Sequence, residues 1–262
     1  MSTQASFFNR SDCAITLLDS AESIDGLLEL ARTAQEEGAD AIALEIAAIP
    51  LEERTVENFR RVITSVPLPF MFICYRNDKY LKDDDEARQE YLLRAAEAGA
   101  EVIDVMGDLY APAPRELATD PAAIEKQKEL IARIHSLGAK VIMSSHFTTG
   151  TMTPDEVLSH IREQRSRGAD ICKLVTRADN EEELHNAIGA LCLLKREFPH
   201  PYVFLCGGKF GRLIRYMGCQ SGVAIEFAVR ESKRSNPASI QPSIKSLRCI
   251  RENLDWTLAA QE

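Results

Sequence analysis

The chain alternates between short apolar runs and longer amphipathic stretches, and this alternation limits its possible folds more than any other feature. Eight runs are rich in Val, Ile, Phe or Leu and lack strict polar alternation, which is typical of strands buried on both faces of a parallel sheet. They recur about every 30 residues, a spacing that favours a (β/α)8 barrel. The runs are residues 13–18, 40–46, 69–75, 101–106, 140–145, 170–175, 202–206 and 222–227.

The stretches between the runs have the pattern of helices packed on one face. Residues 23–37, for example, place Ile24, Leu27, Leu28 and Ala31 on a single stripe. Glycine just past a helix end supplies a left-handed cap, and several stretches end in Gly-Ala. The other stretches are residues 86–98, 122–137 and 155–167, and Gly-Ala occurs at residues 38–39, 99–100, 138–139 and 168–169.

We therefore predict one (β/α)8 barrel domain over residues 1–262, with a last helix over residues 240–258. Thr153, followed by a proline and two acids, predicts the start of one of the helices. A doubly wound open sheet is the alternative. That fold would favour a glycine-rich loop after the first strand, and residues 17–23 (LLDSAES) offer none.

Composition and charge exclude several classes of partner. Hydrophobic residues make up 45% of the 262 residues, and the net charge is −9, so neither a nucleic-acid surface nor a polybasic membrane surface is expected. No apolar run reaches about 18 residues, the length that spans a bilayer. The first 15 residues lack a charged-then-apolar signal pattern, so we expect a cytoplasmic protein.

The seven cysteines are odd in number, scattered and never in a C-x-x-C pair. They predict free, mostly buried thiols in a reducing compartment. None clusters with the five histidines, so no metal site is expected. The cysteines are Cys13, Cys74, Cys172, Cys192, Cys206, Cys219 and Cys249.

In a barrel of this type the active site lies at the carboxyl ends of the strands. The polar residues at or shortly after these ends are therefore the candidates for chemistry. Strand three is predicted to end at Arg76. The candidates are Glu45, Arg76, His146, Lys173, Arg215 and Ser235.

Lys173 interrupts the apolar run 170–175, where a charged side chain is costly to bury. A lysine with a pKa near 10.4 is neutral only about 0.04% of the time at pH 7. Burial that lowers the pKa by roughly 3 raises this fraction to about 30%, and a neutral amine can attack a ketone or aldehyde. The pattern fits either a Schiff-base lysine or a lysine paired with a carboxylate such as Glu45.

His146 ends the fifth predicted strand, where it is placed for acid–base chemistry near neutral pH or for a plain hydrogen bond in a loop. A lysine on the adjacent strand favours the first interpretation. The other histidines, at positions 135, 160, 185 and 200, lie in predicted helices or a turn beside prolines. We expect those four on the surface.

The remaining candidates fit more than one role. Glu45 and Arg76 could bind hydroxyls or a carboxylate, or form a structural ion pair. Arg215 could bind a substrate carboxylate in a two-pronged contact, or lie on the surface of a helix. Residues 206–211 (CGGKFG) look like a phosphate loop but match no established phosphate-binding pattern. The acidic run 83–86 predicts a solvated helix start and not a metal site.

From about residue 13 to 250 the sequence resembles the type I 3-dehydroquinate dehydratase family, the Schiff-base-forming enzymes of the shikimate pathway. The strongest pieces are VIMSSHF at residues 141–147 and GADICKLVTRADNEEEL at residues 168–184. Weaker pieces are ALEI (43–46), FMFICYR (70–76), EVIDV (101–105), KFGRLIR (209–215) and RSNPASI (234–240).

The resemblance implies a (β/α)8 barrel, often a homodimer, that needs no metal or organic cofactor and acts on a small polyhydroxy oxo acid. By this resemblance Lys173 forms the imine and His146 is the general base and acid. The substrate-binding residues it implies are Glu45 and Arg76 for the ring hydroxyls, Arg215 for the carboxylate, and Ser235 and Ser239 in a loop.

Several pocket positions depart from the family pattern. An arginine usually stands where this chain has Ala47, and a methionine pair where it has Leu205 and Gly207. The glutamate that supports the histidine is replaced by Tyr80, or by Asp78 if the gap falls elsewhere, and the last loop reads PAS at residues 237–239 instead of PGQ. Each lost hydrogen bond to a charged group costs about 1.5–3 kcal/mol, so three losses could abolish binding of the usual substrate.

Three functions follow from these observations. The first is the family's dehydration of 3-dehydroquinate to 3-dehydroshikimate. The second is the same Schiff-base chemistry on a different small hydroxy-oxo acid, which the changed positions motivate. The third is a non-catalytic barrel that binds a small acid.

Overall fold

The computed structural model describes residues 5–233 and 240–253, which contain eight parallel strands in one sheet. The strand order is β7-β6-β5-β4-β3-β2-β1-β8, so each strand lies beside its neighbour in the chain and β1 pairs with β8. The two edges nearly close the barrel, where the N–H of Ala224 donates to the carbonyl of Tyr202 at 2.8 Å. The strands are β1 (Ala14–Ser20), β2 (Ala41–Glu45), β3 (Phe70–Ile73), β4 (Val102–Met106), β5 (Lys140–His146), β6 (Ile171–Arg177), β7 (Tyr202–Gly207) and β8 (Ile225–Ala228).

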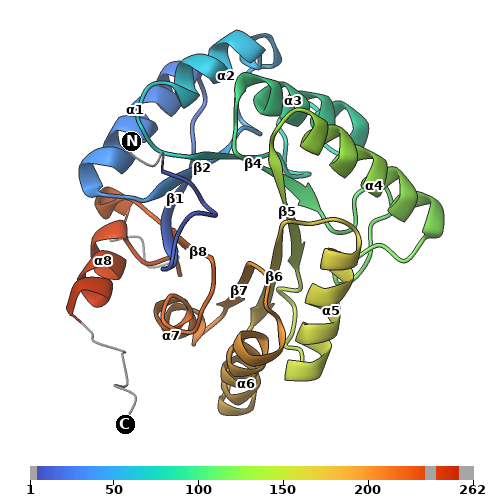
Figure 1. The fold of residues 1–262 in the computed structure, drawn as a ribbon, viewed down its shortest axis with the longest axis vertical. Helices are drawn as coiled ribbons and strands as arrows, with labels where there is room; N and C mark the ends of the chain where they lie inside the picture. Colours follow the sequence, from blue (N-terminus) through green and yellow to red (C-terminus); the bar gives the residue numbers. More distant parts are fainter. Residues whose placement is uncertain (1–4, 234–239, 254–262) are drawn as a thin grey trace.

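Eight helices follow the strands in turn and surround the barrel (Figure 1). The predicted (β/α)8 fold is therefore confirmed. The helices are α1 (Ile24–Glu37), α2 (Val56–Ile63), α3 (Asp85–Ala98), α4 (Pro121–Ser136), α5 (Pro154–Ser166), α6 (Glu181–Glu197), α7 (Gly211–Gly218) and α8 (Ile244–Asn253), with 3-10 turns at Leu51–Glu53 and Glu231–Lys233.

Local signals set several helix ends as predicted. The Thr153 side chain accepts from the N–H of Glu156, whose carboxylate accepts from the Thr153 N–H, a reciprocal cap that starts α5. Gly99 ends α3 with φ 106°, a left-handed conformation that suits glycine, and the glycines of the other three Gly-Ala pairs also have positive φ.

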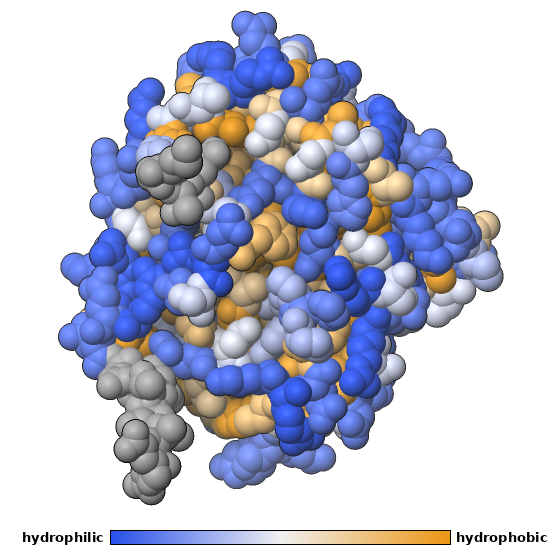
Figure 2. Space-filling model, in the orientation of Figure 1, coloured by the Kyte–Doolittle hydropathy of each residue, from blue (hydrophilic) through white to orange (hydrophobic). Residues whose placement is uncertain are grey.

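Side chains on each strand alternate between the barrel interior and the layer of helices. One apolar cluster fills the interior and includes Ala43, Val102, Ile142 and Ile171. A second cluster lies between strands and helices. Figure 2 shows hydrophilic side chains over the surrounding helices and apolar side chains toward the centre. Counting by two from the interior residues places the side chains of Glu45, Asp104, His146 and Lys173 inside the barrel toward the carboxyl ends.

Two predicted strand limits were wrong. β3 ends at Ile73 and not at Arg76, because the chain turns where the Asp78 N–H donates to the Tyr75 carbonyl. β8 begins at Ile225 instead of residue 222, because Gly222 adopts a left-handed turn with φ 94° just before it.

The last helix begins later than predicted. α8 starts at Ile244, because the Pro242 carbonyl accepts from Val229 and the Ser243 hydroxyl accepts the Ser246 N–H, which caps the helix there. Its predicted end at residue 258 lies outside the described residues. The prediction of a single domain over residues 1–262 stays a prediction. None of the helices in residues 5–233 and 240–253 is long and apolar enough to cross a bilayer.

Candidate active site

A cavity of about 360 Å³ opens at the carboxyl end of the barrel. Its walls come from the ends of β2 to β5 and from the loops that follow β3 and β4. The lining residues are Glu45, Tyr75, Arg76, Asn77, Met106, Glu116 and His146.

A larger cavity of about 1000 Å³ lies at the opposite end, around the starts of β3 and β4. Its acidic lining residue, Glu101, already accepts a hydrogen bond from the Ser6 hydroxyl. The smaller cavity gathers the ionisable side chains, so chemistry and not size selects it as the candidate site.

Lys173 lies in the middle of β6 and is only 4% exposed. Its Nζ is 3.1 Å from Nε2 of His146 and 3.5 Å from the hydroxyl of Tyr75. Burial lowers the pKa of Lys173, while the negative charges of Asp104 and Glu116 partly oppose that shift. Among the described carboxylates none lies within ion-pair distance of Nζ, so the predicted alternative of a lysine paired with Glu45 is wrong.

Register explains why these two side chains meet. In the β5–β6 ladder Ser144 pairs with Lys173 and His146 pairs with Val175, so the imidazole stands one inward step above the amine. Both side chains point inward on neighbouring strands, and the long lysine side chain spans that step.

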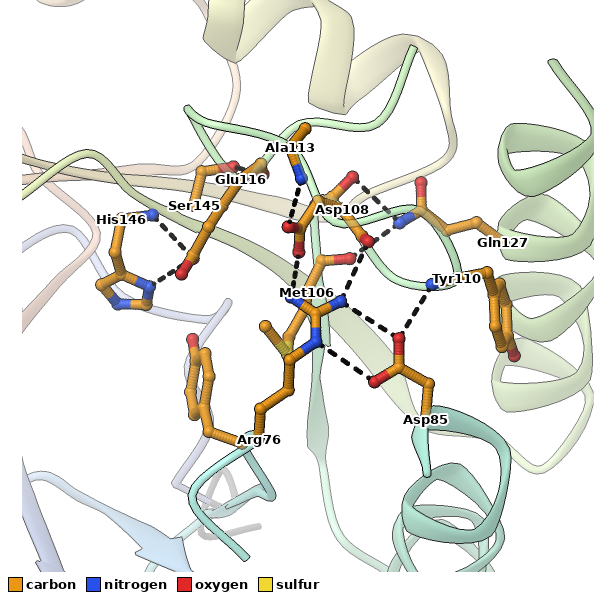
Figure 3. A network of polar contacts seen from close by, with 12 residues as sticks. Arg76, Asp85, Met106, Asp108, Tyr110, Ala113, Glu116, Gln127, Ser145 and His146 are labelled. Carbon is orange, nitrogen blue, oxygen red and sulfur yellow. Dashed lines mark hydrogen bonds and ion pairs between the residues drawn. The ribbon is translucent and has the colours of Figure 1, made fainter. Parts of the chain in front are cut away.

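His146 is held by one carboxylate from the loop after β4. Oε2 of Glu116 lies 2.8 Å from both the backbone N and Nδ1 of His146 (Figure 3). Burial would raise the pKa of Glu116, but the bonds from His146 outweigh it and hold that pKa below its usual value. Because a carboxylate only accepts, Nδ1 carries the proton and Nε2 presents its lone pair to Lys173.

The pKa of His146 lies below its ordinary value of 6.5. Burial is the largest cause, followed by the positive charge of Lys173, and Glu116 and Asp104 oppose both. The imidazole is therefore largely neutral at pH 7 and able to accept a proton at Nε2.

The structure corrects our prediction for the support of His146. Tyr80 is 47% exposed, and Asp78 forms a buried ion pair with Arg54 at 2.6 Å, so neither reaches the imidazole. The carboxylate that contacts the imidazole belongs to Glu116, which sequence reasoning missed because a lone glutamate in a loop carries no pattern.

Asp104 and Tyr75 lie beside Lys173 and Ser144 in the site, and sequence analysis did not predict either of them. Asp104 is buried and accepts from the Ser144 hydroxyl at 2.6 Å and from the Tyr75 hydroxyl at 3.4 Å. Burial raises the pKa of Asp104, although the charge of Lys173 acts in the opposite direction. The sequence signal was present, since Asp104 interrupts the fourth apolar run as Lys173 interrupts the sixth.

Glu45 lines the cavity at the end of β2, as predicted. Burial raises its pKa to about 8, although its Oε1 accepts the Ala47 N–H at 3.0 Å. A carboxyl that keeps its proton at pH 7 can donate a hydrogen bond to an oxygen of a bound molecule.

Arg76 borders the cavity but is engaged within the protein. It donates four hydrogen bonds, to the carboxylate of Asp85, the carboxylate of Asp108 and the carbonyl of Asp108 (Figure 3). One of its five N–H groups remains.

The prediction of a solvated acidic run is wrong for Asp85, whose side chain is 12% exposed and also pairs with Arg88, whereas Asp84 caps α3 as expected.

Arg215 lies on α7 and is only 5% exposed, so the predicted alternative of a surface arginine is wrong. Its Nη1 is 3.5 Å from Oε1 of Glu226 on β8. Ile225 and Phe227 face the barrel interior, so Glu226 faces outward, beside Gly218 of α7. The structure does not bring Arg215 onto the cavity, and Ser235 and Ser239 lie outside the described residues.

One of the histidines expected on the surface is buried. His160 on α5 is 6% exposed, and burial, followed by the charge of Arg167, lowers its pKa to about 4. Over residues 5–233 and 240–253, no group of three His, Cys, Asp or Glu side chains is placed to hold a metal ion.

Comparison with known proteins decides the family. The family model described as Type I 3-dehydroquinase matches residues 18–255. The chain belongs to this family. A "3-dehydroquinate dehydratase" of Alkaliphilus oremlandii is 34% identical over 126 residues, 48% of each chain, and one of Klebsiella pneumoniae is 26% identical over 170 residues, 64% of this chain and 62% of that one. These matches span less than two thirds of the relatives' lengths.

Solved structures with this fold include members of the same family. The type I 3-dehydroquinate dehydratase from Clostridium difficile with covalently modified comenic acid has a TM-score of 0.76 and 18% identity, with 93% of this chain and 92% of that chain covered. The enzyme from Geobacillus kaustophilus has a TM-score of 0.74 and 18% identity, with 92% and 91% covered. At this identity the likeness establishes the fold.

Proposed function

We propose that this family member dehydrates 3-dehydroquinate to 3-dehydroshikimate through an imine on Lys173, as a lyase of the shikimate pathway. The single observation that carries the proposal is the 3.1 Å approach of the buried Lys173 Nζ to Nε2 of His146 inside the barrel. A nucleophile and a proton acceptor at that separation are what imine-dependent elimination requires.

Imine formation is the task of Lys173. Burial lowers its pKa and so raises the fraction of neutral amine at pH 7. The amine adds to the ketone carbon, and loss of water gives an imine that draws electrons from the neighbouring carbon. The Tyr75 hydroxyl, 3.5 Å from Nζ, is placed to hold the departing oxygen.

His146 carries the protons in the next steps. Its Nε2 removes a proton from the carbon beside the imine, which leaves an enamine. The enamine expels the β-hydroxyl, which takes that proton from His146 and departs as water. A second water then hydrolyses the imine and frees Lys173. Proton transfer by one positioned residue contributes roughly 10²–10⁴-fold to the rate.

Substrate contacts are proposed for most of the other predicted residues. The protonated Glu45 carboxyl lines the cavity and can bind a ring hydroxyl. Arg76 also lines the cavity, but its four hydrogen bonds go to Asp85 and Asp108. Arg215 can bind the substrate carboxylate if it turns from Glu226, since its Nε and Nη1 have no hydrogen-bond partner among the described residues. Ser235 and Ser239 are proposed as loop contacts on the family resemblance alone.

A different small hydroxy-oxo acid is the second candidate substrate, and one observation favours it. Arg76 donates four hydrogen bonds to Asp85 and Asp108, so these N–H groups are not available to a substrate. Ala47, where the family usually has an arginine, has no charged side chain that could replace them. Fewer donors then face a polyhydroxy ring than the family pattern implies.

Turnover of 3-dehydroquinate tests the proposal. The conjugated enone product absorbs in the ultraviolet, so its appearance can be followed directly. Borohydride should inactivate the protein only when substrate is present. A His146→Ala variant should turn over roughly 10²–10⁴-fold more slowly. No product from 3-dehydroquinate, together with borohydride inactivation by another oxo acid, would move the support to the second candidate.

We also propose a cytoplasmic homodimer. The unpaired cysteines support a reducing location, and the family resemblance supports the dimer. Light scattering on the purified protein measures the oligomeric state, and a monomer across micromolar concentrations would contradict the second part.

A further inference from the structure

The loop that joins β4 to α4, residues 107–120, has a backbone that needs outside support. Tyr110 and Glu116 both have positive φ, at 70° and 45°, although neither is glycine. Such conformations persist only where surrounding contacts hold them, and they concentrate at functional sites. Those contacts therefore show what the loop is built to present.

Arg76 holds the middle of this loop. Its guanidinium donates to the carboxylate of Asp108 at 2.9 Å and to the Asp108 carbonyl at 3.1 Å. The same two carboxylates that surround Arg76 also accept backbone N–H groups of the loop, Asp85 from Tyr110 at 3.0 Å and Asp108 from Ala113 at 2.9 Å (Figure 3). The guanidinium is thus the centre of a cluster that ties the loop to the end of β3.

Buried side chains from three other elements hold the ends of the loop. Gln127 of α4 donates to the Met106 carbonyl at 2.7 Å, and the Ser145 hydroxyl donates to the Glu116 carbonyl at 2.5 Å. Arg167, at the end of α5, donates to the Ala118 carbonyl at 2.6 Å. The backbone of residue 116 is therefore fixed directly beside β5.

These contacts direct the carboxylate of Glu116 toward His146. Its Oε2 accepts hydrogen bonds from both the backbone N–H and the ring Nδ1–H of His146, each at 2.8 Å. We propose that Glu116 is the positioning residue of His146, and that Arg76 acts through the loop to deliver it instead of binding substrate hydroxyls. This inference rests on the proposed function where it is tested by enzyme kinetics. A second test, the NMR titration of His146, does not depend on that function.

Glu116 would have two effects on the imidazole. It keeps the proton on Nδ1, so that Nε2 faces the reacting carbon unprotonated. It also supplies negative charge that raises the pKa of His146 against burial and against Lys173. The charged groups that face the ring are Glu116 from the loop, Asp104 from β4 and Lys173 from β6.

Glu116→Gln separates positioning from simple support of the fold. The amide keeps the size of the side chain but loses the charge and can donate to Nδ1, which favours the wrong tautomer. We expect kcat to fall about 10²-fold and the acid limb of the kcat–pH profile to move to lower pH. Trapping of the Lys173 imine by borohydride should persist, and Glu116→Asp should restore part of the rate.

The same charge effect can be measured without turnover. The imidazole of His146, followed by NMR in the free protein, should titrate at a lower pH in Glu116→Gln than in the unchanged protein. If the unchanged protein has no activity, the proposed function fails while this titration still tests the role of Glu116. A slower Glu116→Gln enzyme with an unmoved acid limb and an unmoved titration would overturn the inference.

Arg76 is tested by comparing it with Asp108. If Arg76 anchors the loop, Arg76→Met and Asp108→Asn should each lower kcat about tenfold with KM nearly unchanged, and the double variant should cost little more than either. Arg133→Met, which removes a surface arginine paired with Glu90, is the matched control. A several-fold rise in KM for Arg76→Met alone would show that Arg76 binds substrate.

A second, independent observation lies at the other end of the barrel. The sulfurs of Cys13, just before β1, and Cys219, just after α7, are 2.9 Å apart although 206 positions separate them in the chain. A disulfide needs about 2.05 Å, so a movement of about 0.9 Å would close it. Cys219 is half-buried and Cys13 is buried, so an oxidant reaches Cys219 first.

We infer that this pair is an oxidation site for peroxides. The sulfur of Cys219 attacks one oxygen of the peroxide, the O–O bond breaks, and Cys219 becomes a sulfenic acid with release of water. The Cys13 sulfur then displaces the hydroxyl, which leaves as a second water, so that two thiols and one peroxide give one disulfide and two waters.

Oxidation with hydrogen peroxide and peptide mapping without reductant tests this site. We expect a Cys13–Cys219 cross-linked peptide and a rise of the melting temperature by about 5–10 °C, because the bond closes a very long loop. Cys219→Ser should abolish both effects, whereas Cys249→Ser, which removes an exposed cysteine, should not. Stable sulfenic or sulfinic acid at Cys219 without the cross-link would overturn the inference.

Discussion

Two arginines of this barrel, the half-buried Arg76 and the buried Arg215, contact acidic residues in very different ways. Arg76 makes four hydrogen bonds to two acidic residues, and both carboxylates also accept backbone N–H groups. Arg215 lies 3.5 Å from Glu226, and neither oxygen of Glu226 has a hydrogen-bond partner among the described residues. Complete hydrogen bonding offsets the cost of burying charge, and incomplete bonding leaves it. We infer that the Arg76 cluster holds a functional loop. The Arg215–Glu226 pair either leaves Arg215 available to a bound anion or lowers the stability of the fold.

We expect substitutions at the carboxyl end of the barrel to abolish activity with little effect on folding stability. Lys173→Met should give the clearest case. Without the amine no imine forms, so kcat/KM should fall by at least about 10⁴-fold. Lys173 has no ion-pair partner among residues 5–233 and 240–253, so its removal should leave the free energy of unfolding unchanged or higher. Steady-state kinetics and urea unfolding measure the two, and a large loss of stability would contradict the comparison.

The pair on α7 and β8 should respond in the opposite way. Arg215→Leu leaves Glu226 buried without its cation, so we expect the free energy of unfolding to fall by about 3–5 kcal/mol. Changing both residues to leucine removes the stranded charge and should restore most of that loss. Urea unfolding of the single and double variants is the measurement, and equal losses in both would show that the arginine acts through packing alone.

Glu45 sharpens the comparison through pH. Burial raises its pKa to about 8, above the ordinary value of 4.5, so the folded state keeps a proton that the unfolded chain releases. The stability it contributes is complete below about pH 4.5 and is lost as the pH rises toward 8. Across that window the unchanged protein should lose about 2 kcal/mol more than Glu45→Gln, because the side chain is only partly shielded from water. The measurement is urea unfolding of both proteins at several pH values. The same dependence of the free energy of unfolding on pH in both would contradict this prediction.

Tyr80 should give the smallest effect. Tyr80 is 47% exposed, and it is Glu116 that is hydrogen-bonded to the His146 ring, although the family resemblance aligned Tyr80, or Asp78, with the glutamate that supports the histidine. Tyr80→Ala should change kcat less than about twofold and leave the acid limb of the pH profile in place. A shifted limb would mean that Tyr80 acts on the imidazole during turnover.

Much of the fold was predictable because its signals are local. The two-sided apolar runs and the glycine caps recur with the βα unit, and they predicted eight strands in a barrel, which the structure shows nearly closed. The limits that failed, at Ile73, Ile225 and Ile244, are set by turns and a cap at residues 75–78, 222 and 243–246, which the apolar runs do not mark.

The candidate site was predictable where a polar side chain interrupts or ends an apolar strand. Lys173 stood out for the first reason and Glu45 and His146 for the second, and the ladder between β5 and β6 brings Lys173 and His146 together. Glu116 was missed because its place depends on how a loop folds over Arg76 and Ser145. The partners of Arg76 and Arg215, which include Asp85 and Glu226, were missed because no sequence pattern shows which way these side chains turn.

The most direct test of the whole account is the position of the borohydride adduct formed with 3-dehydroquinate. Reduction during turnover, followed by peptide mapping, should place one substrate-derived mass on Lys173, in the unchanged protein and in Glu116→Gln alike. An adduct on any other lysine, or none with any oxo acid under conditions where the protein binds that acid, would contradict the account.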